Sequence, residues 1–202
     1  MRHLAEGIRR FHHDVFPTHA ELFRHLATTH RPSTLFIGCS DARVVPELIT
    51  QQDPGELFVI RTAGNLVPAY ASGADGVAAS IEYAVAVLAV SDIIVCGHSA
   101  CGAMTALAER HDLTALPSVA GWLRHADASR ARVGTTDAQG DVTALIHENV
   151  LAQLANLATH PSVASALARG TIRLHGWSFD IATGTVDELS PGVRLPTALA
   201  AV

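Results

Sequence analysis

Short, largely apolar runs constrain the fold of this chain more than any other feature of its sequence. Residues 34–37, 57–60 and 93–96 are three such runs, and Gly38 and Gly97 directly follow the first and the third. Continuous apolar character over so few residues is typical of a strand that is buried on both faces of a sheet. Segments with helical spacing of apolar residues alternate with these runs. The alternation predicts an α/β fold in which helices flank a mostly parallel sheet.

The rest of the chain continues this alternation. Apolar spacing predicts helices over residues 77–88, 101–110 and 142–157, and a shorter helix that stops at Gly170. Residues 171–177 and 185–189 are predicted strands joined through Gly184, and the polar segment 127–141 is predicted to be a surface loop. A chain of 202 residues has the usual size of one domain, so we expect a single domain over residues 1–202.

The first 30 residues are predicted to form a helical arm of that domain. Leu4, Ile8 and Phe11 keep the spacing of one helix face. Thr18 and Glu21 match a capping box, which predicts that a second helix begins there.

Composition and charge exclude several classes of function. The net charge of −5 offers no attraction to nucleic acid or to an anionic membrane, so neither partner is expected. All 14 cationic side chains are arginines, which excludes Schiff-base chemistry and a P-loop lysine. The longest apolar stretch, residues 77–90, is interrupted by Ser80 and Glu82 and is too short to span a bilayer. No signal-peptide pattern opens the chain, and three cysteines suit a reducing compartment, so we expect a cytoplasmic protein.

Two segments with unusual chemistry lie at the ends of predicted strands. Residues 38–43 (Gly-Cys-Ser-Asp-Ala-Arg) follow the first apolar run, and residues 97–102 (Gly-His-Ser-Ala-Cys-Gly) follow the third. The carboxyl ends of parallel strands meet at one edge of a sheet, so we expect Cys39, His98 and Cys101 to converge. Two thiolates and an imidazole are good zinc ligands and leave a fourth position open. The sequence therefore predicts a metal site there.

Other interpretations of these residues are weaker. A serine hydrolase needs Gly-x-Ser-x-Gly, and Cys101 stands where the second glycine is required. A redox Cys-x-x-Cys is absent because Cys96 and Cys101 are five positions apart, and Cys96 is predicted to be a core residue. Taken alone, Cys39 would be a small buried side chain and His98 a hydrogen-bonded structural residue. Their joint occurrence at two strand ends favours the metal site.

Asp41 and Arg43 follow Cys39 at alternate positions. A carboxylate beside a metal could be a fourth ligand, an acceptor from bound water, or an exposed turn residue. An arginine two positions later can hold the carboxylate through paired hydrogen bonds and keep it ionised.

The chain resembles the β-class carbonic anhydrases. The resemblance rests on Cys-Ser-Asp-Ala-Arg at residues 39–43 and on Gly-His-Ser-Ala-Cys-Gly at residues 97–102, and it covers residues 16–189. Supporting segments are residues 54–61, 64–65, 80–85 and 175–177.

The resemblance implies one zinc ion per chain, held by Cys39, His98 and Cys101. It implies reversible hydration of CO2 to bicarbonate and a proton by zinc-bound hydroxide, with Asp41 and Arg43 as the catalytic pair. Further implied features are a homodimer or a dimer of dimers, in which the N-terminal helices wrap around the partner subunit. The implied substrate pocket includes Phe58 and Tyr83, supplied across the subunit interface, together with Gly102.

The chain departs from the family pattern in two informative places. His30 stands where many relatives carry a glutamine, and it could act as a donor or proton carrier in the pocket or be merely solvated. Phe36 and Phe179 stand where the bicarbonate-gated subclass has Trp and Tyr, and only Arg61 is kept. We therefore expect the constitutively open subclass.

Two alternative functions stay open. The same fold could hydrolyse CS2 or COS, which are also small linear molecules. A zinc-containing binding or sensor module, in which Asp41 stays on the metal, is the alternative from a different class. The presence of both Asp41 and Arg43 argues against it, because a purely structural site needs no such pair.

Overall fold

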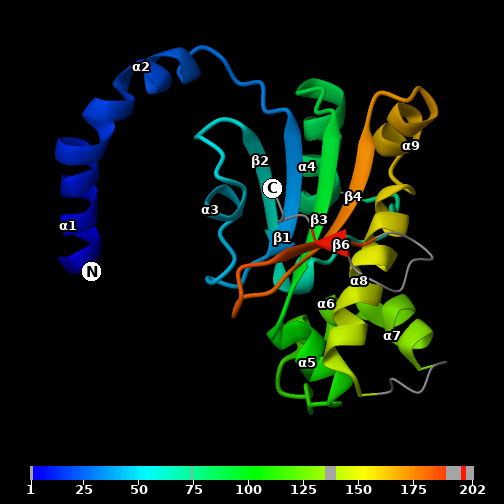
Figure 1. The fold of residues 1–202 in the computed structure, drawn as a ribbon. Coiled ribbons are helices and arrows are strands. Elements are labelled where there is room, and N and C mark those ends of the chain that lie inside the picture. The colour runs from blue at the N-terminus through cyan, green and yellow to red at the C-terminus, as the bar shows by residue number, and fades with distance from the viewer. Residues whose placement is uncertain (1, 74, 135–139, 190–196, 199–202) are drawn as a thin grey trace. The chain divides into compact units, whose positions relative to one another are not determined.

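The computed structural model describes residues 2–73, 75–134, 140–189 and 197–198. The chain divides into two compact units, Met1–Arg31 and Pro32–Val202 (Figure 1). Among the described residues, no helix combines the length and the apolar character needed to cross a membrane.

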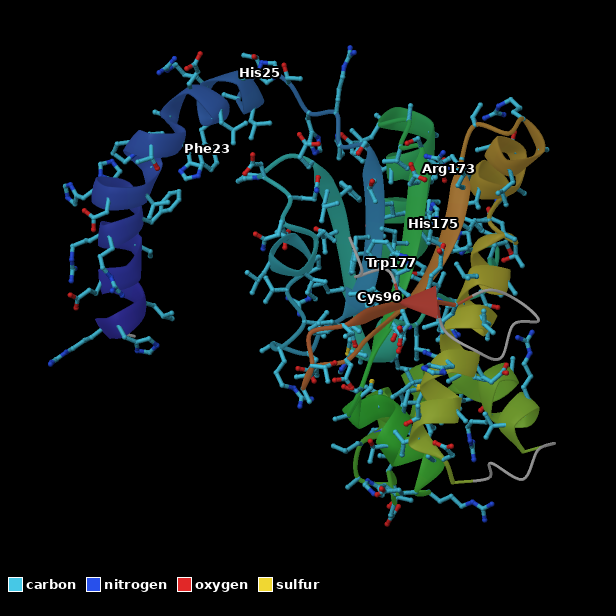
Figure 2. The ribbon with its side chains drawn as sticks, in the orientation of Figure 1. Phe23, His25, Cys96, Arg173, His175 and Trp177 are labelled. Atoms are coloured by element: carbon cyan, nitrogen blue, oxygen red, sulfur yellow. The ribbon has the colours of Figure 1, made fainter. Side chains whose placement is uncertain are left out.

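The N-terminal unit is a run of helix from Arg2 to Leu26. It consists of α1 (Arg2–Arg10), a π-helical turn η1 (Phe11–Val15) and α2 (Phe16–Leu26). The predicted capping box is wrong, because Thr18 lies inside α2 and its hydroxyl donates to the carbonyl of Val15 at 2.7 Å. None of the side chains of this helical run is buried within the unit. Its apolar side chains, among them the ring of Phe23 labelled in Figure 2, are therefore only partly covered.

The second unit is built on a six-stranded sheet with strand order β2-β1-β3-β4-β5-β6. The strands are β1 (Thr34–Cys39), β2 (Leu57–Thr62), β3 (Asp92–His98), β4 (Arg173–Phe179), β5 (Val186–Leu189) and β6 (Thr197–Ala198). The first four pair in parallel, and β5 and β6 continue the sheet antiparallel beyond β4. The predicted α/β class with a mostly parallel sheet is confirmed.

Helices flank this sheet (Figure 1). They are α3 (Pro46–Thr50), α4 (Gly76–Glu82) continuing into η3 (Tyr83–Val87), α5 (Gly102–Ala108), α6 (Pro117–Leu123), α7 (Asp127–Val133), α8 (Val142–Leu157) and α9 (Pro161–Ala168), with short 3-10 turns η2 (Ala63–Asn65) and η4 (Arg124–Ala126). The predicted loop over 127–141 is wrong for its first half, which forms α7. Ser129 and Val133, four positions apart, are buried on one face of α7, and this tertiary burial outweighs the polar composition. Residues 135–139 lie outside the described part of the chain.

Glycines let α8 lie close against the sheet. A Cβ added at Gly97 would come within 2.8 Å of Val150, and one added at Gly176 would come within 3.0 Å of Val150 and Leu154. Both glycines lie on the same face of neighbouring strands, so their missing side chains make room for the helix. On the opposite face, Cys96 is fully buried in an apolar cluster with Trp177 (both labelled in Figure 2), which confirms its predicted place in the core.

An ionic cluster joins β3 to β4 at the amino ends of these strands. Two guanidinium nitrogens of Arg173 donate to the carboxylate of Asp92 at 2.8 Å, and His175 lies 2.9 Å from the same carboxylate (Figure 2). These hydrogen bonds, led by Arg173, hold the pKa of Asp92 well below its usual range. The cluster therefore stabilises the folded chain when Asp92 is ionised.

Asp92→Asn is expected to lower the free energy of unfolding by about 1 kcal/mol at pH 7, because it removes a partly exposed ion pair. Since the pKa of Asp92 is lower in the folded chain than in the unfolded one, this contribution is complete above about pH 4 and is lost as the pH falls further. Urea unfolding between pH 2 and pH 7 checks this. The exposed control Asp53→Asn should change little, and a deficit in Asp92→Asn that is as large at pH 2 as at pH 7 would contradict the assignment.

Candidate metal centre

The register of two neighbouring strands brings the predicted ligands together. In the parallel pair β1 and β3, Gly38 aligns with Cys96, so Cys39 and His98 end adjacent strands at the same edge of the sheet. A tight turn with Ala100 at a φ of 54° then returns Cys101 to that edge. The ligand atoms of Cys39, His98 and Cys101 lie within 4.8 Å of one another, and all three residues are buried. The structure therefore confirms that these three side chains converge.

The hydrogen bonding of His98 leaves one nitrogen available for a metal. Nδ1 lies 2.9 Å from the carbonyl oxygen of Ser99, which can only accept, so Nδ1 carries the proton and Nε2 presents its lone pair. Nε2 is buried and has no hydrogen-bond partner among the described residues. A buried polar atom without a partner is costly, and a metal ion would satisfy it. This arrangement fits a metal held by His98 together with the two sulfurs.

The two neighbouring thiols shift each other's pKa in opposite directions. The pKa of Cys39 is lowered chiefly because its sulfur accepts a hydrogen bond from the Cys101 thiol, and the backbone N–H groups of Asp41 and Gly64 add to this effect against the opposing effect of burial. The pKa of Cys101 is raised because its thiol donates to Cys39 and is buried. Two neighbouring thiolates repel, so the pair keeps one proton unless a cation compensates both charges. A divalent metal is such a cation.

Asp41 lies beside this group in a fixed orientation. Arg43 donates to its two carboxylate oxygens at 2.9 and 2.7 Å, and the backbone N–H of Arg43 adds a third hydrogen bond at 2.9 Å. These bonds hold the pKa of Asp41 well below its usual range, so the carboxylate is ionised at neutral pH. Oδ2 of Asp41, the oxygen that accepts from Arg43 at 2.7 Å, is 4.0 Å from Nε2 of His98. Arg43 also donates to the carbonyl of Ala100 at 3.1 Å and so joins the two strand-end segments.

Arg61 holds the loop that carries Cys39 and Asp41. Its guanidinium donates to the backbone carbonyls of Cys39, Asp41 and Val44 at 3.1, 2.6 and 2.7 Å. Sequence reasoning noticed Arg61 only as part of a family pattern and missed this contact. In the sheet, Arg61 aligns with Gly38, and that register is the signal that would have revealed its position.

The predicted pocket residues do not all lie next to the three ligands within one chain. Gly102 follows Cys101 and borders open space, since a Cβ there would meet no atom within 4 Å. The rings of Phe58 and Tyr83 lie 5.9 Å apart. Phe58 aligns with Leu35, four residues before Cys39, so within one chain it lies about 13 Å from the ligand edge along the strand. His30 belongs to the N-terminal unit rather than to the unit that holds the ligands.

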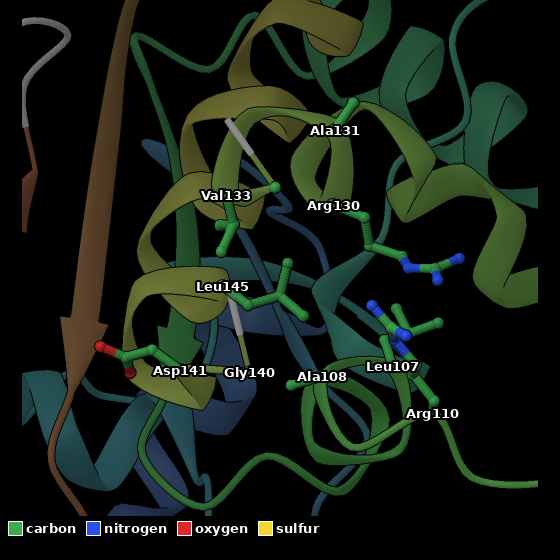
Figure 3. Close-up of a pocket in the computed structure, with 10 residues that line it drawn as sticks. Leu107, Ala108, Arg110, Arg130, Ala131, Val133, Gly140, Asp141 and Leu145 are labelled. Carbon is green, nitrogen blue, oxygen red and sulfur yellow. The ribbon is translucent and has the colours of Figure 1, made fainter. Parts of the chain in front are cut away.

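A separate cavity of about 260 Å³ lies between α5, α7 and α8 (Figure 3). Arg110 and Arg130 line it together with Asp141. The carboxylate of Asp141 is engaged in capping α8 through the N–H groups of Thr143 and Ala144. Neither cysteine nor histidine is among the described residues that line this cavity.

The fold and this residue group define an α/β protein with a Cys-His-Cys metal-binding group, and comparison with known proteins gives its family. The family model described as carbonic anhydrase matches residues 34–186. The carbonic anhydrase of Pseudomonas aeruginosa is 54% identical over 203 residues, which cover 99% of this chain and 92% of that protein.

Solved structures agree with this comparison. The β-carbonic anhydrase CcaA superposes with a TM-score of 0.92 at 41% identity, covering 98% of both chains. A structure reported among two tetrameric β-carbonic anhydrases of Sordaria macrospora gives a TM-score of 0.75 at 31% identity, covering 98% of this chain and 95% of that one. The chain belongs to the β-class carbonic anhydrases.

Replacing either sulfur should abolish metal binding. Cys39→Ser and Cys101→Ser are each expected to reduce bound zinc from about one ion per chain to a small fraction, because a thiolate ligand is lost. Cys96→Ala is the matched control, since burial raises the pKa of Cys96 to about 12 and it lies outside the ligand group. Elemental analysis of the purified variants provides the measurement. Full zinc content in Cys39→Ser would contradict the assignment.

Proposed function

We propose that this protein hydrates CO2 reversibly to bicarbonate and a proton, with one Zn²⁺ per chain held by Cys39, His98 and Cys101. The observation that carries the proposal is the convergence of three buried ligand atoms within 4.8 Å, one of them the unpartnered Nε2 of His98. Zinc in an open three-ligand site supplies hydroxide near neutral pH by lowering the pKa of a bound water.

Asp41 and Arg43 are the proposed catalytic pair. An ionised carboxylate can only accept hydrogen bonds, so Asp41 would accept a hydrogen bond from the hydroxide that zinc supplies and would thereby direct the lone pair of that hydroxide towards CO2. Arg43 fixes the carboxylate through the two hydrogen bonds from its side chain. Two thiolate ligands offset the charge of a divalent metal, so the nucleophile is acidified less than it would be by three imidazoles. Hydration should therefore rise with pH from about 6.5 to about 9.

Stopped-flow CO2 hydration, with zinc counted in the same sample, tests this function. The native protein should hydrate CO2 rapidly at one zinc per chain. Asp41→Asn should keep its zinc and lose about 100-fold in kcat, because an amide can orient the nucleophile wrongly. Asp53→Asn serves as the control. A native rate in Asp41→Asn would remove Asp41 from the mechanism, and zinc-replete protein without hydration would favour the sensor alternative or another linear substrate.

The site is further proposed to belong to the constitutively open subclass. Phe36 is fully buried against the ring of Trp177, and Phe179 is 9% exposed, so neither position offers a hydrogen bond to bicarbonate. Two of the three guanidinium nitrogens of Arg61, Nε and Nη2, already donate to backbone carbonyls at the end of β1 and in the loop that follows it. Both features support an ungated site.

Bicarbonate inhibition of hydration distinguishes the two subclasses. We expect weak inhibition that follows a simple hyperbola, since no second bicarbonate closes the site. Inhibition curves measured at several pH values provide the check, and a steep, cooperative curve would contradict the open assignment.

The assembly is proposed to be a homodimer or a dimer of dimers. The arm is predicted as residues 1–30 of a single domain. Its side chains Leu4 and Ile8 are 56% and 69% exposed, which supports a partner subunit that covers them.

Phe58 and Tyr83 are proposed to line the partner's pocket, and the 43% exposure of Tyr83 is consistent with this. His30 and Gly102 are both proposed to belong to the substrate pocket, His30 as a donor or proton carrier. An unchanged kcat/KM in His30→Ala would dismiss its role.

The compartment is proposed to be the cytoplasm. Cys39, Cys96 and Cys101 are all free thiols, as expected of a protein in a reducing environment. The net charge of −5 supports small-molecule substrates rather than nucleic acid as partners.

A further inference from the structure

One peptide unit connects helix α6 to the Cys39 sulfur. This unit joins Ala63 to Gly64 in the turn η2. Its N–H, on Gly64, donates to the sulfur of Cys39 at 3.4 Å. Its carbonyl, on Ala63, accepts a hydrogen bond at 2.9 Å from the indole N–H of Trp122. Both polar groups of the same peptide plane are therefore engaged, one by the ligand and one by a residue distant in sequence.

The turn around this peptide is held rigidly. Gly64 has a φ of 73°, and a Cβ there would lie 2.9 Å from the Cβ of Ala103, so only glycine fits. The next carbonyl, that of Gly64, accepts from the side-chain amide of Asn149 at 3.0 Å. Asn149 is itself fully buried and accepts a hydrogen bond from Gln153 at 2.9 Å. The turn η2 is thus held by α6 through the carbonyl of Ala63 and by α8 through the carbonyl of Gly64.

Hydrogen bonds in series strengthen one another. A donor on a peptide oxygen polarises the amide and makes its N–H a better donor. An N–H that donates to a metal thiolate withdraws charge from the sulfur, so the sulfur gives less charge to the metal and the metal becomes a stronger Lewis acid. We propose that Trp122 is a positioning residue for this reaction, acting through the Ala63–Gly64 peptide to set how strongly Cys39 donates to the metal. The inference rests on the proposed function of the metal site.

A purely structural role makes a different prediction. Trp122 also packs its ring against that of His125 in the following turn η4, with centroids 5.1 Å apart, and its indole N–H anchors α6 to the turn η2. If anchoring were its whole role, losing the indole N–H would lower stability without changing the sulfur. The two roles are therefore distinguished by the electronic state of the Cys39 thiolate.

Trp122→Phe in the full-length, cobalt-loaded protein tests the proposal spectroscopically. The phenylalanine keeps an aromatic ring and removes the N–H. The absorption band in which charge moves from thiolate sulfur to cobalt should shift to lower energy, because the sulfur becomes more electron-rich. Trp177→Phe is the matched control: Trp177 is the other of the two tryptophans, lies against Phe36, and should leave the band in place.

The amide proton of Gly64 provides a second readout in the zinc-loaded protein. Labelling alanine at the carbonyl carbon and glycine at nitrogen selects Ala-Gly pairs, of which the sequence has two, ending at Gly64 and Gly121. Gly121→Ala removes the second signal and so assigns the first. The Gly64 amide proton should move upfield in Trp122→Phe, as its hydrogen bond to sulfur weakens, and should stay in place in Trp177→Phe.

The outcomes separate this proposal from the proposed function. A shifted cobalt band together with a shifted Gly64 signal supports the role of Trp122. A native sulfur-to-cobalt band that does not move in Trp122→Phe overturns it and leaves the metal site intact. Absence of the band in the native protein overturns both. If Trp122→Phe folds poorly, benzothienylalanine incorporated at position 122 in Trp177→Phe protein removes only the N–H, and the same two readouts decide.

Discussion

The parallel pairing of β1 with β3 is the constraint on which the rest of this structure depends. It places the last residue of each strand, Cys39 and His98, at one edge, and a short turn adds Cys101. A shift of one residue in this register would turn alternate side chains to the other face and separate the ligands. Gly97 is compatible with this pairing because it has no side chain on the face that α8 covers. A side chain there would clash with Val150 of α8.

Around the strand edge, backbone carbonyls are held by side chains from elsewhere in the fold. Arg61 holds the loop that follows β1, Arg43 joins this loop to the turn before Cys101, and Trp122 and Asn149 hold the turn η2. Such support keeps ligand positions fixed before any metal or substrate binds, which lowers the reorganisation needed during reaction. Of these supporting side chains only Asn149 is fully buried, and its hydrogen bonds with Gly64 and Gln153 offset the cost of burying its amide.

The sequence predicted those features that depend on local pattern. Continuous apolar runs located β1, β2 and β3, and the helical spacing over residues 142–157 matched α8. Local patterns predicted the wrong structure in two places. Thr18 matched a helix cap but lies within α2. Residues 127–133 were predicted to be a loop but form α7, because Ser129 and Val133 become buried in tertiary contacts. The ligand trio was predictable because strand ends meet at one edge. The supporting roles of Arg61 and Trp122 were not, since each contacts carbonyls that are remote in sequence and carry no side-chain signature.

X-ray absorption at the zinc edge tests most directly the central claim that two strand ends and one turn jointly hold a catalytic metal. The account predicts two sulfur scatterers at about 2.3 Å and one imidazole nitrogen at about 2.0 Å, with a fourth, lighter ligand completing a tetrahedron. A shell made entirely of oxygen and nitrogen would contradict it, because Cys39 and Cys101 would then not be ligands. A shell of four sulfurs would contradict it equally, since the described ligand group supplies only two.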